Sequence, residues 1–252
     1  MATRADLLAY CRARLEPERY RDVAVNGLQV EGADEVRRLA VAVSTSAHTI
    51  GQAAAWGAEA LLVHHGLLWG SGLQPLTGLL GSRLRALFKH DINLIAFHLP
   101  LDGHPEIGNN ALLARELGLT VEAQFGEVAG MPLGVVGAAV EERPFEEFLG
   151  AVARLVERAP LVVGEAGEAV RRVGILSGSG YGTLAEAAEL GCDALLTGDI
   201  REPTMAEARE LGIAVIAAGH EATERLGVQA LAAELAREFG IETRYFHDPN
   251  PV

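Results

Sequence analysis

The chain has 252 residues, a length that accommodates one large domain or two small ones. Apolar residues make up 49% and charged residues 22%, as in an ordinary globular protein with a sizeable core. The formal net charge of −13 disfavours binding to the phosphate backbone of nucleic acids, because proteins that bind it usually have a basic face.

The chain has two cysteines, Cys11 and Cys192, which lie far apart in the sequence and form no Cys-x-x-Cys motif. This pattern fits a reducing compartment better than a disulfide scaffold. The first six residues contain no apolar signal core, and the sequence has no run of eighteen apolar residues. We therefore expect no membrane span and a cytoplasmic location.

Hydrophobic periodicity and turn residues predict helices that alternate with strands along the whole chain. Helices are expected over 4–16, 46–57, 82–90, 108–117, 144–156, 183–190, 203–211 and 221–239. Strands are expected over 28–30, 38–44, 61–63, 93–98, 134–140, 161–164, 173–176, 194–199, 213–218 and 241–246. The prolines of 99–105 predict an irregular loop. This alternation predicts an α/β fold with largely parallel strand pairing.

The sequence also contains an internal similarity. Residues 39–65 and 173–199 align without gaps at an offset of 134, which matches His65 with Asp199. We predict a duplication that gives two similar α/β domains, over 1–125 and 126–252, with the C-terminal helix packing back on the first. The site is expected between the two copies.

Ligands of open α/β sheets bind at the carboxyl ends of the strands. Five of the eight histidines follow predicted strands, and acidic residues accompany them. The residues at these ends are His64, His65, His98, Asp102, His104, Asp199, His220, Glu221 and Glu224. Each has a simpler alternative: an exposed histidine pair at 64–65, a core histidine at 98, a turn cap at 102, or a solvated helix face at 220–224. Their conjunction indicates a site.

Five of these side chains offer three imidazoles and two carboxylates, namely His64, His65, Asp102, His220 and Glu224. A structural zinc site needs four ligands and usually a closed Cys/His set. Five mixed nitrogen and oxygen ligands suit two divalent ions about 3.5–4 Å apart. Zinc, iron, manganese and cobalt all accept this donor set.

The glycine-rich stretch 178–182 lies between a predicted strand and a predicted helix, where backbone N–H groups can bind an anion. The dinucleotide fingerprint needs glycine at the position of Thr183. The stretch is therefore a weak signal for a dinucleotide-dependent oxidoreductase, and a tight turn that requires glycine explains it equally well.

Several motifs together resemble the Nif-three-like family, also called GTP cyclohydrolase 1 type 2 homologues. They cover essentially the whole chain: Asn26-Gly27-Leu28-Gln29-Val30, Val63-His64-His65-Gly66, His98-Leu99-Pro100-Leu101-Asp102, Gly108-Asn109-Asn110, Thr197-Gly198-Asp199 and Gly219-His220-Glu221-Ala222-Thr223-Glu224. The resemblance implies two α/β domains, a dinuclear metal centre and a homohexameric ring. It also implies the same five ligands, with His98 beside them.

Two departures from the family pattern affect the substrate contacts. Gly66 stands where many members have proline, and Arg201-Glu202-Pro203 lacks a histidine that many members carry. The function expected is that of a metal-dependent hydrolase acting on a small polar or nucleotide-like molecule, with His98 as acid–base group and Glu221 as a weaker candidate. The alternative is a non-enzymatic, metal-binding regulatory or interaction protein.

Overall fold

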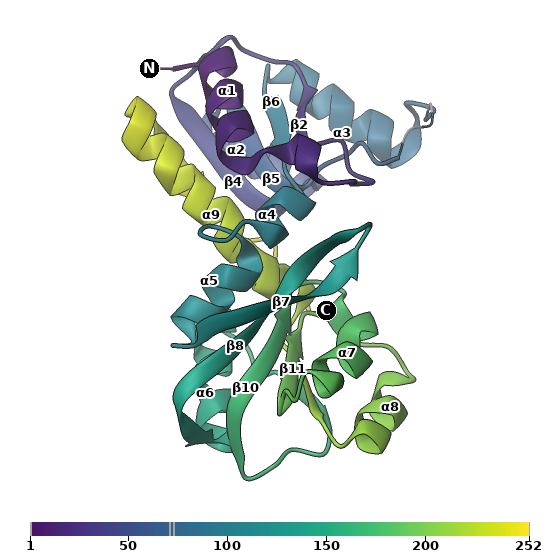
Figure 1. Cartoon of the computed structure of the whole chain (residues 1–252). Helices are drawn as coiled ribbons and strands as arrows, with labels where there is room; N and C mark the ends of the chain where they lie inside the picture. The colour runs from purple at the N-terminus through teal and green to yellow at the C-terminus, as the bar shows by residue number, and fades with distance from the viewer. Residues whose placement is uncertain (1, 71, 73, 252) are drawn as a thin grey trace. The chain divides into compact units, whose positions relative to one another are not determined.

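A computed structural model describes residues 2–70, 72 and 74–251 (Figure 1). The chain divides into two compact units. Unit 1 comprises Met1–Leu101 and Gly227–Pro249, and unit 2 comprises Asp102–Leu226 and Asn250–Val252. Within the described part of the chain, no helix combines the length and apolar character needed to cross a bilayer.

Unit 1 is built on a five-stranded sheet of order β13-β4-β5-β6-β2. Strand β2 pairs antiparallel with β6, and the other pairs are parallel. The elements of this unit are β1 (Ala2–Thr3), α1 (Arg4–Leu15), the 3-10 helix η1 (Pro17–Arg19), β2 (Gly27–Val30), β3 (Glu35–Val36), β4 (Arg38–Ser44), α2 (Ala47–Trp56), β5 (Ala60–His65), α3 (Gly78–Lys89), β6 (Asn93–Ala96) and β13 (Glu242–Tyr245). Helices α4 (Leu99–Gly103) and α9 (His220–Phe239) each run across the division between the units.

The central strands of unit 1 are almost continuous runs of buried aliphatic residues, as parallel strands covered on both faces require. Ile50 of α2 and Leu84 and Leu87 of α3 pack with Leu61 and Val63 in one core cluster. Helices α2 and α3 therefore cover the same face of this sheet.

Within unit 1, the later turns of α9 pack on α1. The Glu234 carboxylate accepts two hydrogen bonds of 3.0 Å from the Arg14 guanidinium and one of 3.2 Å from the Tyr10 hydroxyl. The Tyr10 ring also meets the Phe239 ring edge-on at 5.9 Å. These contacts explain why residues from Gly227 onward belong to the first unit.

Unit 2 is built on a six-stranded sheet of order β7-β8-β10-β11-β12-β9. Strands β10, β11 and β12 are parallel, and the other pairs are antiparallel. Its elements are α5 (Asn109–Glu116), β7 (Thr120–Val128), β8 (Met131–Pro144), α6 (Phe145–Val156), β9 (Leu161–Gly164), β10 (Ala169–Leu176), η2 (Gly180–Thr183), α7 (Leu184–Glu189), β11 (Ala194–Thr197), α8 (Thr204–Leu211) and β12 (Ala214–Ala217). Figure 1 shows α7 and α8 on one side of this sheet, and apolar residues of α5 and α6 share a single core cluster.

The mixed α/β fold is confirmed, although some elements differ from those expected. Strand β7 was not predicted, and the antiparallel pairs β7–β8, β8–β10 and β12–β9 make the sheet of unit 2 mixed instead of largely parallel. The expected loop at 99–105 is partly the short helix α4, because Pro100 occupies its first turn, where a missing N–H costs nothing. The division into units also falls at Leu101, whereas the predicted boundary was 125/126; β7 and α5 both pack on β8 in unit 2.

The two units share a set of hydrogen bonds around their first parallel strands. In each unit, one carboxylate accepts hydrogen bonds from the backbone N–H groups of two successive arginines. The guanidinium of the second arginine donates to a backbone carbonyl at the end of a helix. The bonds run from Arg37 and Arg38 to Glu59 (3.1 and 2.8 Å) and from Arg38 to Trp56 O (2.9 Å) in unit 1, and from Arg171 and Arg172 to Asp193 (2.7 and 2.8 Å) and from Arg172 to Leu190 O (2.5 Å) in unit 2. Every residue of unit 2 in this set lies 134 positions after its counterpart.

Replacing Phe148 by alanine should destabilise the protein by about 3–5 kcal/mol. Phe148 lies on the apolar face of α6 and is 1% exposed in the core of unit 2, so the substitution leaves a cavity. Phe88→Ala is the control, since the Phe88 side chain on α3 is 62% exposed and its loss should cost less than about 0.5 kcal/mol. Urea unfolding of both variants measures the difference, and equal costs would contradict the core assignment.

Both thiols should be unreactive in the folded protein. Burial raises the pKa of Cys11 to about 12 and that of Cys192 to about 11, so almost no thiolate forms at neutral pH. We expect a thiol-specific disulfide reagent at pH 7.5 to detect no cysteine before unfolding and both after addition of guanidinium chloride. Rapid labelling of the native protein would show that one of these sites opens easily.

Candidate metal centre

Three histidines lie together in unit 1. His64 and His65 end β5, and His98 follows β6, which pairs with β5 in parallel. The ring centroid of His64 is 4.7 Å from that of His65 and 5.0 Å from that of His98, and the centroids of His65 and His98 are 5.6 Å apart. One nitrogen of each ring lies within 4.8 Å of the other two, so the three imidazoles could share a metal ion.

Each of these rings is held at Nδ1 by a neighbouring group. The contacts are His64 Nδ1 to Phe97 O (3.1 Å), His65 Nδ1 to Ser44 Oγ (3.1 Å) and His98 Nδ1 to Asp22 Oδ1 (2.9 Å). Histidines that bind metals usually have such a partner on the second ring nitrogen, which fixes the ring and directs the other nitrogen to the ion. Nε2 is accordingly the nitrogen that each ring offers.

Asp102, at the end of α4, is buried in unit 2 and 7% exposed. Its Oδ1 accepts hydrogen bonds from Asn109 Nδ2 at 2.9 Å and from Ser177 Oγ at 3.1 Å. Both donors are neutral, so they orient the carboxylate without cancelling its charge. A buried carboxylate in this setting favours a nearby cation.

His220 and Glu224 stand one turn apart at the start of α9. His220 Nδ1 contacts Asp199 Oδ2 at 2.9 Å, and His220 Nε2 contacts Glu224 Oε1 at 3.3 Å. Carboxylate oxygens of Glu224 and Asp102 lie within 4.8 Å of each other. The hydrogen bond and the charge of Glu224, helped by Asp199, raise the pKa of His220 to about 9, although burial opposes this. The cluster thus attracts positive charge.

Gly178 permits the close packing around Glu224. Its φ of +60° is a conformation that side chains other than glycine rarely adopt, and an added Cβ would collide with Glu224 Oε1. Thr223 Oγ1 accepts a hydrogen bond from the Gly178 N–H at 3.1 Å. Residues Gly180–Thr183 continue as the 3-10 helix η2. These contacts account for the glycine-rich stretch as a tight turn.

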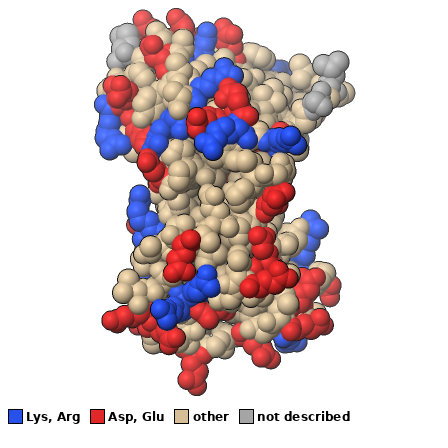
Figure 2. All heavy atoms as spheres, viewed as in Figure 1, with Lys and Arg blue, Asp and Glu red and all other residues tan. Residues whose placement is uncertain are grey.

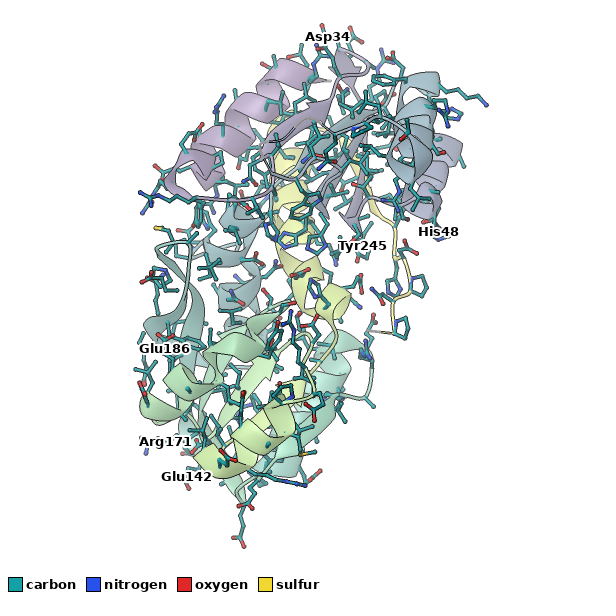
Figure 3. The ribbon with its side chains drawn as sticks, turned by 90° about the vertical axis from the view of Figure 1, so that its right-hand side faces the viewer. Asp34, His48, Glu142, Arg171, Glu186 and Tyr245 are labelled. Carbon is teal, nitrogen blue, oxygen red and sulfur yellow. The ribbon has the colours of Figure 1, made fainter. Side chains whose placement is uncertain are left out.

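His104 and Glu221, which the sequence also singles out, have structural partners. His104 is buried, and its Nδ1 accepts from the backbone N–H groups of Glu106 and Ile107 at 3.1 and 3.2 Å. Glu221 accepts from the Arg225 guanidinium at 2.9 Å. His48 lies exposed at the outer edge of unit 1 (Figure 3). These contacts of His104 are thus with its own loop, and that of Glu221 is with the next turn of its own helix.

Sequence reasoning missed the residues that orient the candidate ligands: Asp22, Ser44, Asn109 and Ser177. Asp22 lies in a segment without helical or strand periodicity, and nothing in its spacing connects it with His98. Asn109 was visible only as part of a recognised motif. The partner of a ligand is chosen by tertiary contact, so a single sequence carries no direct signal for it.

The donor set fits divalent transition metals. Imidazole nitrogens and carboxylate oxygens are their usual ligands in proteins, whereas an all-oxygen set would favour magnesium or calcium. Three predicted residues lie in unit 1 and three in unit 2, and within each unit they gather at the carboxyl ends of parallel strands. The chain therefore carries His/Asp/Glu clusters that could bind metal.

Comparison with known proteins agrees with the sequence motifs. A protein of Deinococcus radiodurans named GTP cyclohydrolase 1 type 2 homolog is 43% identical over 246 residues, covering 98% of this chain and 93% of that protein. The solved structure of the protein ybgI, described as of unknown function, superposes with a TM-score of 0.92 at 37% identity, covering 99% of this chain and 100% of that one.

The crystal structure of TTHA1606 from Thermus thermophilus gives a TM-score of 0.89 at 36% identity, covering 99% of this chain and 100% of the other. Both solved structures thus match this fold along its full length. The model of the Duf34/NIF3 family, described as NGG1p interacting factor 3, matches residues 2–251. With this match over almost every residue, the chain belongs to the Duf34/NIF3 family.

Proposed function

We propose that the clusters of the two units converge on two divalent metal ions, and that the protein is a metal-dependent hydrolase. The proposed ligands are His64, His65, Asp102, His220 and Glu224. The observation that carries the proposal is that a hydrogen-bond partner holds Nδ1 of His64, His65 and His220 and Oδ1 of Asp102. The Nε2 atoms and Asp102 Oδ2 are then the atoms that would bind the ions. The substrate would be a small polar or nucleotide-like molecule, as the relatives' name suggests.

Chain connectivity supports convergence. Asp102 follows His98 by four residues, so their Cα atoms cannot be more than about 14 Å apart. His220 and Glu224 open α9, whose later turns belong to unit 1. The covalent chain thus ties both carboxylate ligands to elements of the histidine-bearing unit.

The shared hydrogen bonds at an offset of 134 support the predicted internal duplication. In that alignment His65 of β5 corresponds to Asp199, which follows β11. Both clusters would then occupy the carboxyl ends of equivalent strands, the usual location of ligands in α/β sheets. A duplicated unit of this kind gives two half-sites of similar geometry and different chemistry.

Bound divalent ions would supply a water of lowered pKa and would polarise the bond to be broken. His98 is the proposed acid–base residue, because Nε2 is the nitrogen that its contact with Asp22 leaves available. Glu221 is the weaker candidate, since its carboxylate already forms an ion pair with Arg225. Asp102 and Glu224 would hold their charges toward the ions while Asn109 and Ser177 keep Asp102 in place.

The test is hydrolysis by the full-length protein loaded with zinc, manganese, cobalt or iron(II). The panel includes nucleoside triphosphates, cyclic nucleotides and phosphoesters. Removing an acid–base group usually costs 10²–10⁴-fold, so His98→Gln should lose at least about 100-fold in kcat. His48→Gln is the matched control. No turnover with any metal, or full activity in His98→Gln, would contradict the proposed mechanism.

The second candidate is a non-enzymatic, metal-binding regulatory or interaction protein. The family description, an interacting factor, favours it.

We also propose a homohexameric ring, which sedimentation velocity would test. Nucleic acid is not a proposed partner, because the formal net charge is −13. On the face in Figure 2, acidic and basic side chains lie among one another in both units. A cytoplasmic location stays a prediction.

A further inference from the structure

Asp22 is a buried carboxylate that no local sequence pattern singles out. Its side chain is 2% exposed. Oδ1 accepts from the Ala24 N–H and contacts His98 Nδ1, both at 2.9 Å, and Oδ2 accepts from the Leu99 N–H at 2.9 Å and from Asn26 Nδ2 at 3.0 Å. All four groups that approach this carboxylate are nitrogens. The site is therefore built to hold an anion.

The charge state of Asp22 determines which nitrogen of His98 carries the proton. The Ala24 and Leu99 N–H groups and Asn26 Nδ2 all donate to this carboxylate, and donors of this kind favour its ionised form. An ionised carboxylate can only accept hydrogen bonds, so His98 Nδ1 must be the donor in this contact. Neutral His98 then has its lone pair on Nε2.

His98 is fixed through its backbone as well as through its ring. Its N–H donates to Asn26 Oδ1 at 2.8 Å, and Asn26 is itself held by Asp22. The Trp69 ring packs edge-on against the imidazole at 5.1 Å. Rotation that would exchange the two ring nitrogens is thereby opposed from several sides. The same Asp22 carboxylate thus sets both the tautomer and the position of the ring.

The partner on Nδ1 distinguishes His98 from the two proposed ligands beside it. His64 has a backbone carbonyl there and His65 has a hydroxyl, which are neutral groups. A carboxylate partner stabilises the imidazolium that forms when a histidine accepts a proton, as in Asp–His pairs of hydrolases. The contact with Asp22 therefore suits His98 to proton transfer.

We propose that Asp22 is the positioning residue of His98: it keeps the proton on Nδ1 and makes Nε2 the atom that exchanges protons at the site. The second half of this statement rests on the hydrolase proposed above. The first half concerns the resting protein and can be tested without any substrate.

The direct test is NMR of the full-length, metal-free protein labelled with ¹⁵N-histidine. Long-range ¹H–¹⁵N correlations at pH 8 distinguish the two neutral tautomers, and His98→Gln assigns the signal by removing it. We expect His98 in the Nδ1–H form in the wild type. An Nε2–H form in the wild type overturns the proposal whether or not the Asp22 variants fold.

Asp22→Asn should convert a substantial part of the His98 signal to the Nε2–H form, because the amide can present a donor to Nδ1. Asp22→Glu, which restores a carboxylate, should return it toward Nδ1–H. Glu59→Gln is the matched control: Glu59 also accepts from two backbone N–H groups but touches no histidine ring in those bonds. An unchanged tautomer in folded Asp22→Asn overturns the proposal.

If the hydrolase panel yields a substrate, Asp22→Asn should lower kcat by about 10–100-fold, with KM changed less than about threefold, as for other groups that orient an imidazole at a metal site. Asp22→Glu should recover part of that loss. A panel without turnover would contradict the hydrolase function while the tautomer result stands, so the two failures are distinguishable. A loss confined to KM would contradict the role of Asp22 in proton transfer.

Discussion

His64→Gln is expected to weaken binding of the first divalent ion by at least about 100-fold. Loss of a group that merely supports a ligand typically costs about 10–100-fold, and His64 is itself a proposed ligand. Its imidazole is fully buried, and its Nδ1 is held by the Phe97 carbonyl, so the ring is fixed in one orientation. Glutamine nearly preserves the volume and leaves an amide, which is a poor ligand for zinc or cobalt.

Affinity is measured by competition with a chromogenic zinc chelator, and metal content by elemental analysis after dialysis. His48→Gln removes an exposed histidine of the same unit and should leave both values unchanged. Thermal unfolding of the metal-free proteins separates loss of metal from loss of fold. Wild-type stoichiometry and affinity in a folded His64→Gln protein would remove His64 from the ligand set.

Gly178→Ala is expected to disturb the carboxylate cluster of unit 2. The added Cβ would collide with Glu224 Oε1 and lie 3.3 Å from His220 Nε2. The positive φ adds backbone strain of about 1–3 kcal/mol. We expect lower thermal stability together with loss of at least one bound ion, since both proposed ligands must shift.

Gly182→Ala is the matched control in the same glycine-rich stretch. A Cβ at position 182 meets no atom within 4 Å, and the residue has no positive φ. Its stability and metal content should remain those of the wild type. If Gly178→Ala retained both ions and the melting temperature of the wild type, the close packing of Gly178 on Glu224 would not matter for the site.

A dinucleotide that bound the wild type and was lost from Gly182→Ala would revive the oxidoreductase alternative.

Local sequence signals were sufficient for most regular elements. Strand β4 was predicted with its observed bounds, because seven residues rich in buried aliphatic side chains have few other stable arrangements. Helix α2 ends at Gly57 as predicted, since that residue adopts a φ of +72°. Strand β7 was missed because most of its residues are exposed on an outer strand, where the hydrophobic pattern is weak.

The prediction for 99–105 failed for a different reason. Proline predicts a break in a helix, but it breaks a helix only beyond the first turn. The Leu99 N–H is also satisfied by Asp22, a residue remote in sequence, which helps the short helix α4 to start directly after His98. Such a contact between distant segments cannot be read from local composition.

The sequence by itself determined the α/β elements, the family and the candidate ligands, because strand ends and motif spacing depend on neighbouring residues in the chain. The tertiary structure alone decided which group faces each Nδ1 and which oxygen of Asp102 is held. It also showed that Gly178 is required by the nearness of Glu224. These features depend on contacts between residues as far as 76 positions apart, and the energy of a hydrogen bond or a steric clash depends on distance in space.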